Sequence, residues 1–199
     1  MDLIFEKRKA RKEATSKRND AHRLISTIAA ERVAQNLSEF LEKDKRGRKI
    51  DIIGGYYPIK TELNLLPVID RLLKIGKRAC LPIIVKKNQP LVFREWDGKS
   101  QLDIGKYDVP IPVGSQKVEP DLLICPLLSY DIAGYRLGYG GGFYDRTIAS
   151  FESKKKSVLV FGCGYSAQFS KRMLPIDQYD RKLDAIITEE GLRFFKQIV

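Results

Sequence analysis

The stretch RLGYGGGFYDR, residues 136–146, combines the residue types that a phosphate-binding loop needs. Gly138, Gly140, Gly141 and Gly142 follow one another so closely that the main chain can take positive φ and lie against a ligand. Consecutive N–H groups turned inward bind phosphate oxygens, more strongly if a helix begins directly afterwards. The flanking arginines, Arg136 and Arg146, add positive charge, and Asp145 adds an oxygen that could bind Mg²⁺.

The loop matches neither of the two familiar nucleotide-binding patterns. No Gly-Lys-Ser or Gly-Lys-Thr ends it, and the wider last gap of the dinucleotide-binding pattern is missing. Taken alone, the loop therefore leaves two interpretations open: a phosphate site, or an ordinary tight turn beside an Asp–Arg surface pair of little energetic weight.

Strand and helix patterns alternate around this loop. Apolar residues at helical spacing predict a helix over residues 21–41, with Leu24, Ile25, Ile28, Val33, Leu37, Phe40 and Leu41 on its buried side. The cationic stretch before it could form its first turns. A second helix is predicted within residues 61–76, and a third over residues 188–199 with Thr188 as N-cap. Apolar runs predict strands at 50–56, 78–85, 90–96 (as an edge strand), 121–128, 157–164 and 183–188, and residues 97–120 are predicted as a loop.

This alternation predicts a layered, Rossmann-like α/β fold. We expect one domain over residues 1–199, with a largely parallel sheet and helices on both faces. In such sheets a ligand binds outside the carboxyl ends of the strands, which is where the glycine-rich loop follows the 121–128 run.

Composition narrows the class of protein. The chain carries 36 Lys and Arg against 25 Asp and Glu, a net charge of +11, which favours an acidic partner such as nucleic acid or a small phosphorylated or carboxylated ligand; a solvated helix face is the alternative. The single histidine, His22, argues against a zinc site, and the three cysteines are expected to be buried thiols. Without an apolar leader or a membrane-length apolar run, we expect a soluble, cytoplasmic protein with no membrane partner.

Four segments together resemble the 5-formyltetrahydrofolate cyclo-ligase family, also called methenyltetrahydrofolate synthetases. RLGYGGGFYDR, preceded by PLLSYDIAGY, resembles the family signature. KRKAR resembles its Lys-x-x-x-Arg element, YYPIKTEL its folate-side segment, and LPIDQYDRKLDAIITEEG its C-terminal block. The segments occur in the family's order, and they span essentially the whole chain.

The resemblance implies a ligase of one-carbon metabolism that uses ATP and Mg²⁺ to close 5-formyltetrahydrofolate to 5,10-methenyltetrahydrofolate, with release of ADP and phosphate. It implies that ATP is bound by Lys7, Arg11, Arg136, Leu137, Gly138, Tyr139, Gly140, Gly141, Gly142, Phe143 and Tyr144. Arg136 and Asp145 are the implied catalytic residues, Asp145 and Asp180 the implied metal ligands, and Tyr57 and Glu62 the implied folate contacts. The partners would be reduced folate and ATP, and we expect a monomer.

The chemistry explains why such residues are needed. A formamide oxygen is a poor leaving group, whereas transfer of the γ-phosphoryl group to it gives a phosphorylated formyl intermediate that the neighbouring aniline nitrogen can attack. Phosphoryl transfer requires alignment and positive charge. Two departures from the family pattern stand out: Ile111 where an acid is expected, and Gly141 where some relatives have lysine. The alternatives are a nucleic-acid-binding protein, which lacks a recognition motif here, and another ATP-using ligase or kinase.

Overall fold

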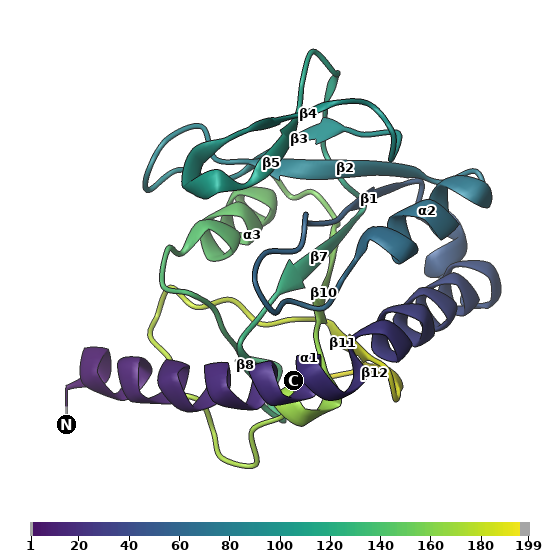
Figure 1. Ribbon diagram of the computed structural model, residues 1–199. Helices are drawn as coiled ribbons and strands as arrows, with labels where there is room; N and C mark the ends of the chain where they lie inside the picture. Colours follow the sequence, from purple (N-terminus) through teal and green to yellow (C-terminus); the bar gives the residue numbers. More distant parts are fainter. Residues whose placement is uncertain (1, 196–199) are drawn as a thin grey trace.

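A central β-sheet organises the chain, whose computed structural model describes residues 2–195 (Figure 1). Within that range the sheet has eight strands in the order β12-β11-β10-β7-β1-β2-β3-β6. Their bounds are β1 Ile52–Gly54, β2 Arg78–Ile83, β3 Val92–Glu95, β6 Lys117–Val118, β7 Leu122–Pro126, β10 Leu159–Cys163, β11 Ala185–Thr188 and β12 Gly191–Phe194. The inner strands β11, β10, β7, β1 and β2 run parallel, and antiparallel pairings add β3, β6 and β12 at the two sides.

Helices cover both faces of this sheet. The helices are α1 Leu3–Lys43, α2 Leu66–Lys74 and α3 Phe143–Ser153. Successive strand residues point to opposite faces: Leu122 and Ile124 pack in one core with α1 and α2, whereas Leu123 and Cys125 pack in the other core with α3. The predicted layered fold, largely parallel with helices on both faces, is confirmed.

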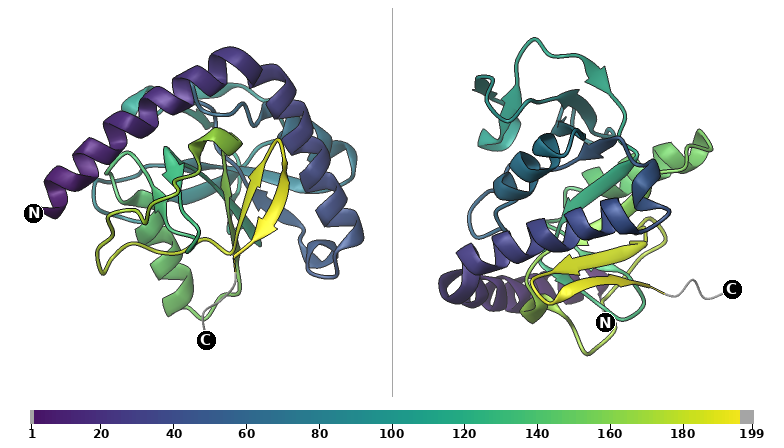
Figure 2. Two further views of the ribbon diagram at one scale, coloured as in Figure 1. Left: turned by 90° about the horizontal axis from the view of Figure 1, so that it is seen from below. Right: turned by 90° about the vertical axis from the view of Figure 1, so that its right-hand side faces the viewer.

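α1 is a single long helix that includes the cationic stretch as its first turns. The Asp2 side chain accepts a hydrogen bond from the Ile4 N–H and so caps the helix, which arches across the body (Figure 2). Small residues such as Ala29, Ala30 and Ala34 form much of its buried face.

The predicted buried face of α1 was wrong at two positions. Leu24 and Ile28 are 75% and 58% exposed. At 100° per residue they lie about 120° and about 160° around the helix from buried Ala30, so they point away from the core. The other predicted apolar residues of this face are buried or pack against the core.

Residues 97–120 are more regular than the predicted loop. They contain the hairpin β4 Leu102–Ile104 and β5 Pro110–Pro112, joined through the 3-10 turn Lys106–Asp108, and then β6. Because β6 pairs with β3, β3 is not the edge strand that the sequence predicted.

The predicted C-terminal helix was also wrong over the described residues. β12 runs antiparallel to β11, and residues 196–199 lie outside the described range. Leu192 and Phe194 alternate with Arg193 and pack against the core that α1 forms with the sheet. This alternating burial stabilises a strand rather than the predicted helix. Thr188 accepts a hydrogen bond from the Glu190 N–H in the turn between the strands.

The connections around β1 create an opening at the carboxyl ends of the strands. The chain passes from β1 through α2 to β2 on one side, and from β7 through α3 to β10 on the other. Such a reversal of direction leaves a crevice between the two central strands. After β7, the short hairpin β8 Ser129–Tyr130 and β9 Arg136–Leu137 leads directly into the glycine-rich loop. Two further 3-10 turns, Gly47–Lys49 and Ser166–Gln168, complete the described elements.

The remaining sequence expectations concern single residue types. Cys80, Cys125 and Cys163 are buried free thiols, as predicted. His22 is half-buried and lies 3.0 Å from the Tyr165 hydroxyl. Over the described part of the chain, we find no helix with the length and apolar character of a membrane span.

Candidate functional site

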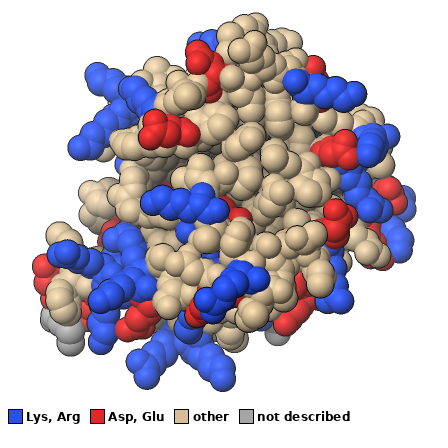
Figure 3. All heavy atoms as spheres, in the orientation of Figure 1, with Lys and Arg blue, Asp and Glu red and all other residues tan. Residues whose placement is uncertain are grey.

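A cavity of about 1030 Å³ lies at the crevice between β1 and β7. Its walls come from the first turns of α1, the segment after β1, the β4–β5 hairpin, the glycine-rich loop with the start of α3, and residues 175–181. Lys and Arg side chains gather over the N-terminal turns of α1, at the lower left of Figure 3. The fold therefore brings five distant segments to one cationic cavity.

The glycine-rich loop presents a row of backbone donors to this cavity. Gly140 has φ of 96° and Gly142 has φ of 65°, conformations that favour glycine. Within residues 2–195, no backbone N–H from Tyr139 to Asp145 has a hydrogen-bond acceptor. Unpaired N–H groups at a helix start bind anions, and the positive end of α3 adds to that attraction.

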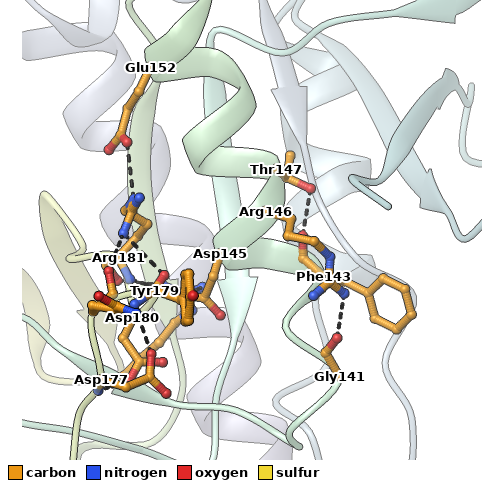
Figure 4. A network of polar contacts seen from close by, with 12 residues as sticks. Gly141, Phe143, Asp145, Arg146, Thr147, Glu152, Asp177, Tyr179, Asp180 and Arg181 are labelled. Atoms are coloured by element: carbon orange, nitrogen blue, oxygen red, sulfur yellow. Dashed lines mark hydrogen bonds and ion pairs between the residues drawn. The ribbon is translucent and has the colours of Figure 1, made fainter. Parts of the chain in front are cut away.

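Gly142 is the N-cap residue of α3 and has no side chain to cap the helix itself. Its φ of 65° disfavours any other residue, and a Cβ there would lie 2.7 Å from Nη1 of Arg146, the movable end of that side chain. Arg146 folds back over the Phe143 ring and donates to the Gly141 carbonyl (Figure 4). Its buried Nε has no partner within the described residues. Arg146 thus holds the loop from one side while keeping donor capacity.

Arg136 and Asp145 form an ion pair inside the cavity wall. The Arg136 side chain is 4% exposed and donates to Asp145 Oδ1 at 2.8 Å and to the Arg181 carbonyl at 2.8 Å. The Arg181 N–H donates to the same Asp145 oxygen at 3.1 Å. The pair is therefore more buried than the surface pair that the sequence left open, and it fixes Asp145 in the first turn of α3.

Lys7 lies between two carboxylates of the 175–181 segment. Its Nζ is 2.7 Å from Asp177 Oδ2 and 2.6 Å from Asp180 Oδ2. Burial alone would lower the pKa of Lys7, but the hydrogen bonds and charges of both aspartates outweigh it and raise that pKa. The hydrogen bond from Lys7 lowers the pKa of Asp177. Asp180 is thus an ion-pair partner of Lys7.

Asp145 and Asp180 retain oxygens that fit a hard cation. The recorded hydrogen bonds of Asp145 use only Oδ1, and those of Asp180 use only Oδ2. In Figure 4 both carboxylates lie on the same side of the first turn of α3, opposite Arg146. The described residues contain no cluster of three or more metal-binding side chains. Two carboxylates suit Mg²⁺, which keeps several waters and binds substrate phosphates.

Arg11 approaches the loop from the opposite wall, on α1. Its Nε donates to the Gly138 carbonyl at 2.9 Å, and its guanidinium lies against Gly140, where a Cβ would be 3.3 Å away. Within the described residues neither Arg11 nor Arg146 has a carboxylate within 4.0 Å. These two guanidinium groups therefore remain available for an anionic ligand.

The segment after β1 forms the other end of the cavity. Glu62 is 5% exposed; its Oε2 accepts from the Ile59 N–H and its Oε1 accepts from the Tyr139 hydroxyl. Burial raises the pKa of Glu62, although these hydrogen bonds act against the rise. Tyr57 is half-buried, with its ring 6.4 Å from that of Trp96. An acid and an aromatic side chain at one wall can hold a flat, donor-bearing ring.

Every residue that the sequence suggested for the site lines this cavity. The structure thus brings Lys7 and Arg11 of α1, Tyr57 and Glu62 after β1, the 136–145 stretch, and Asp180 together; their roles stay predictions. Ile111, noted as a departure from the family, lines the cavity too.

Three neighbours of the site were missed: Arg18, Tyr107 and Asp177. Arg18 shares one face of α1 with Lys7, Arg11 and Ala14, a spacing that the sequence does contain. Asp177 lies three residues before Asp180, and that spacing of two acids was also visible. Tyr107, whose ring is 6.2 Å from Phe143, lies in the hairpin that was predicted as a loop, so no pattern marked it.

Comparisons with known proteins agree on one family. A model of the 5-formyltetrahydrofolate cyclo-ligase family matches residues 4–189. The 5-formyltetrahydrofolate cyclo-ligase of Escherichia coli K12 is 33% identical over 133 residues, covering 64% of this chain and 71% of that protein. The Mycoplasma genitalium enzyme of the same name is 28% identical over 186 residues, covering 92% and 98%. The NMR structure of Aquifex aeolicus 5,10-methenyltetrahydrofolate synthetase superposes with a TM-score of 0.74 at 28% identity, covering 96% of this chain and 93% of that one.

Proposed function

Because the chain belongs to the 5-formyltetrahydrofolate cyclo-ligase family, we propose that it uses ATP and Mg²⁺ to convert 5-formyltetrahydrofolate to 5,10-methenyltetrahydrofolate, with release of ADP and phosphate. The observation that carries this proposal is the row of unpaired N–H groups from Tyr139 to Asp145 at the start of α3. The row lies between the guanidinium groups of Arg11 and Arg146, which contact loop carbonyls but, within the described residues, have no carboxylate partner. That combination suits the phosphates of ATP.

In the proposed ATP site, the loop N–H groups and the basic side chains have different roles. The loop N–H groups bind phosphate oxygens, and Arg11 and Arg146 approach from opposite walls. Arg136 is already paired with Asp145, so its proposed role is to hold that carboxylate and to add positive charge behind it. Lys7 reaches the phosphates if it leaves the carboxylates of Asp177 and Asp180, a change that an incoming anion favours.

Asp145 and Asp180 are the proposed Mg²⁺ ligands, through the oxygens that no hydrogen bond occupies. When bound, the ion supplies positive charge to the phosphate oxygens during transfer. Asp145 is held by Arg136 and by the Arg181 N–H, so its geometry is set before a ligand arrives. Asp180 accepts from the Asp177 N–H at 2.8 Å, which fixes its carboxylate in the same way.

The proposed reaction proceeds in two steps. The formyl oxygen of the folate attacks the γ-phosphorus of ATP, and ADP leaves. The aniline nitrogen next attacks the activated formyl carbon and loses its proton, and the carbon–oxygen bond breaks to release phosphate. The chain contributes alignment and positive charge rather than a covalent group, as expected for phosphoryl transfer.

Tyr57 and Glu62 are the proposed folate contacts. A carboxylate held by the Ile59 N–H and the Tyr139 hydroxyl keeps lone pairs for the donor groups of a pterin ring. The Tyr57 ring offers an apolar face for the same ligand. The net charge of +11 suits two anionic substrates and requires no nucleic acid. The cytoplasmic location and the monomeric state stay predictions.

The test is an absorbance assay of purified protein with 5-formyltetrahydrofolate, ATP and Mg²⁺. We expect the methenyltetrahydrofolate band to grow only when all three are present. In Asp145→Asn, which still offers Arg136 an acceptor, the rate of that growth should be at least 100-fold lower. The exposed Glu152→Gln on the same helix is the matched control and should keep the rate. No growth by a folded wild-type protein that binds ATP would contradict the function and favour another ATP-using ligase or kinase.

A further inference from the structure

Arg18 is buried in a way that its sequence neighbours are not. It lies on α1 with 2% of its surface exposed, whereas Lys17 and Asn19 are exposed. Within the described residues no carboxylate lies within 4.0 Å of its guanidinium. A buried charge without a partner is costly, so its surroundings must compensate it or use it.

The guanidinium contacts the glycine-rich loop and the folate-side segment together. Nε donates to Thr61 Oγ1 at 3.1 Å, and Nη1 donates to the Tyr139 hydroxyl oxygen. The guanidinium also lies 5.3 Å from the centre of the Tyr139 ring. Thr61 donates in turn to Asn19 at 2.6 Å, which fixes its lone pairs toward Arg18. One side chain of α1 therefore touches both walls of the cavity.

The Tyr139 hydroxyl has one proton, and Arg18 decides where it points. Because the hydroxyl oxygen accepts from Arg18, its own hydrogen is directed to Glu62 Oε1, 2.8 Å away. The Ile59 N–H occupies Oε2 at 2.9 Å. The carboxylate of Glu62 is thus oriented from two sides, and the negative charge that compensates Arg18 lies one hydroxyl group away.

We propose that Arg18 is a positioning residue that, through the Tyr139 hydroxyl, links the ATP-binding loop to Glu62 and so makes the binding of one substrate tighten the binding of the other. The inference rests on the proposed function. ATP bound on the loop N–H groups holds Tyr139 in place, Tyr139 with Arg18 holds Glu62, and a held Glu62 receives the pterin without a further ordering cost. The reverse order works equally, because such coupling is reciprocal.

Other charged and titratable groups surround Glu62, so the test must distinguish the effect of the Tyr139 hydroxyl from theirs. Lys60 is on the same segment, Arg18 approaches from α1, and Tyr139 from the loop. Tyr56 of the segment after β1, Cys163 of β10 and Tyr144 of α3 also lie near enough to interact with it electrostatically. A test that removes only the Tyr139 hydroxyl changes none of the other groups.

The experiment measures the dissociation constant of 5-formyltetrahydrofolate by calorimetry, with and without a saturating non-hydrolysable ATP analogue and Mg²⁺. For the wild type we expect the analogue to tighten folate binding by about 5-fold or more. Tyr139→Phe and Arg18→Met should each bring that ratio close to one. The double variant should lose no more than either single variant, because both remove the same link. Lys17→Met, which removes a neighbouring exposed charge, should keep the full ratio.

Kinetics give an independent readout. We expect Tyr139→Phe to raise the KM for the folate about 5-fold or more at saturating ATP, and less at sub-saturating ATP, while kcat changes less than 3-fold, since the link acts on binding. A purely structural role would lower the unfolding midpoint and leave the coupling ratio unchanged.

Each outcome decides between explanations. A wild type that forms the methenyl band and binds both ligands, with the same coupling ratio in Tyr139→Phe, overturns this inference and leaves the proposed function standing. The partly exposed Tyr139 side chain makes that variant the safer one if Arg18→Met fails to fold. A folded wild type that binds neither ligand overturns the proposed function, and this inference with it.

Discussion

The two halves of α1 have the same secondary structure but different surroundings. From Leu3 to about Asp20, the inward face carries Lys7, Arg11 and Arg18, which contact the cavity walls through polar bonds. From Ala21 to Lys43, the inward face carries residues such as Val33 and Leu37, which pack against the strands of the sheet. Figures 1 and 2 show the first half passing beside the cavity segments and the second half beside α2 and β12.

One helix thus serves both stability and ligand binding. Close packing in the second half fixes the position of the helix on the sheet, because protein cores tolerate few voids. Because the helix is continuous, the first half is held in place as well, and its long cationic side chains reach the cavity. We expect substitutions in the second half to change the free energy of unfolding, and those in the first half to change ligand binding.

The largest expected effect is on stability, for Leu37→Ala. Leu37 has 0% of its surface exposed, so the truncation should lower the free energy of unfolding by about 2–5 kcal/mol, measured by urea denaturation. The turnover of the folded fraction should not change. Leu24→Ala, at 75% exposure on the same helix, should cost less than about 0.5 kcal/mol. Equal losses for the two variants would break the comparison.

The next effect is on binding, for Arg11→Met. Losing the bond to the Gly138 carbonyl and the guanidinium charge should weaken binding of the Mg²⁺–ATP analogue by about 10- to 100-fold, or about 1.4–2.8 kcal/mol, measured by calorimetry. The free energy of unfolding should fall by less than about 1 kcal/mol, because the side chain packs in no apolar core. The exposed Lys12→Met is the control, and it should leave both quantities near the wild-type values. An Arg11→Met variant that loses stability but keeps its affinity for the ATP analogue would show that the first half of α1 serves stability rather than ligand binding.

The smallest effect is the pH dependence that Asp177 contributes. Its pKa is lowered below 3.8 by the hydrogen bond from Lys7, so its stabilising contribution is present above the unfolded pKa and lost as pH falls through the folded one. Asp177→Asn should therefore lower the free energy of unfolding near neutral pH, measured by urea denaturation, by about 0.5–1 kcal/mol at most for a partly exposed pair. The difference from the wild type should vanish in strongly acidic solution. A difference that persists there would show that the asparagine disturbs the segment by other means.

The central part of the fold could be predicted from the sequence because its signals are local. Buried parallel strands such as β7 and β10 are continuous apolar runs, and they stood out as such. β12 did not, since TEEGLRFF also fits the start of a helix and only packing on α1 decides between the two. The β4–β5 hairpin, whose strands have three residues each, left no run long enough to notice.

The residues of the candidate site that belong to one sequence motif could be predicted. Those whose role depends on burial in the folded chain could not. The glycine-rich loop is a local cluster with recognisable chemistry. Arg18 and Lys17 are both basic residues of α1 on different faces of the helix, and the sequence does not show that a tyrosine and a threonine from distant segments contact Arg18. The Lys7 partners, Asp177 and Asp180, likewise depend on tertiary structure.

The long sequence separation of that last contact has a consequence for synthesis on the ribosome. Lys7 and its partner Asp180 lie 173 positions apart, so the helix that bears Lys7 leaves the ribosome well before its acidic partners. Nascent chains gain structure from the N-terminus onward, at about 5–20 residues per second. Until residue 180 has left the ribosome, Lys7 lacks the two carboxylates that bind it in the folded protein. The wall of the cavity that residues 175–181 form is therefore added last, after the glycine-rich loop and the first turns of α1 have been synthesised.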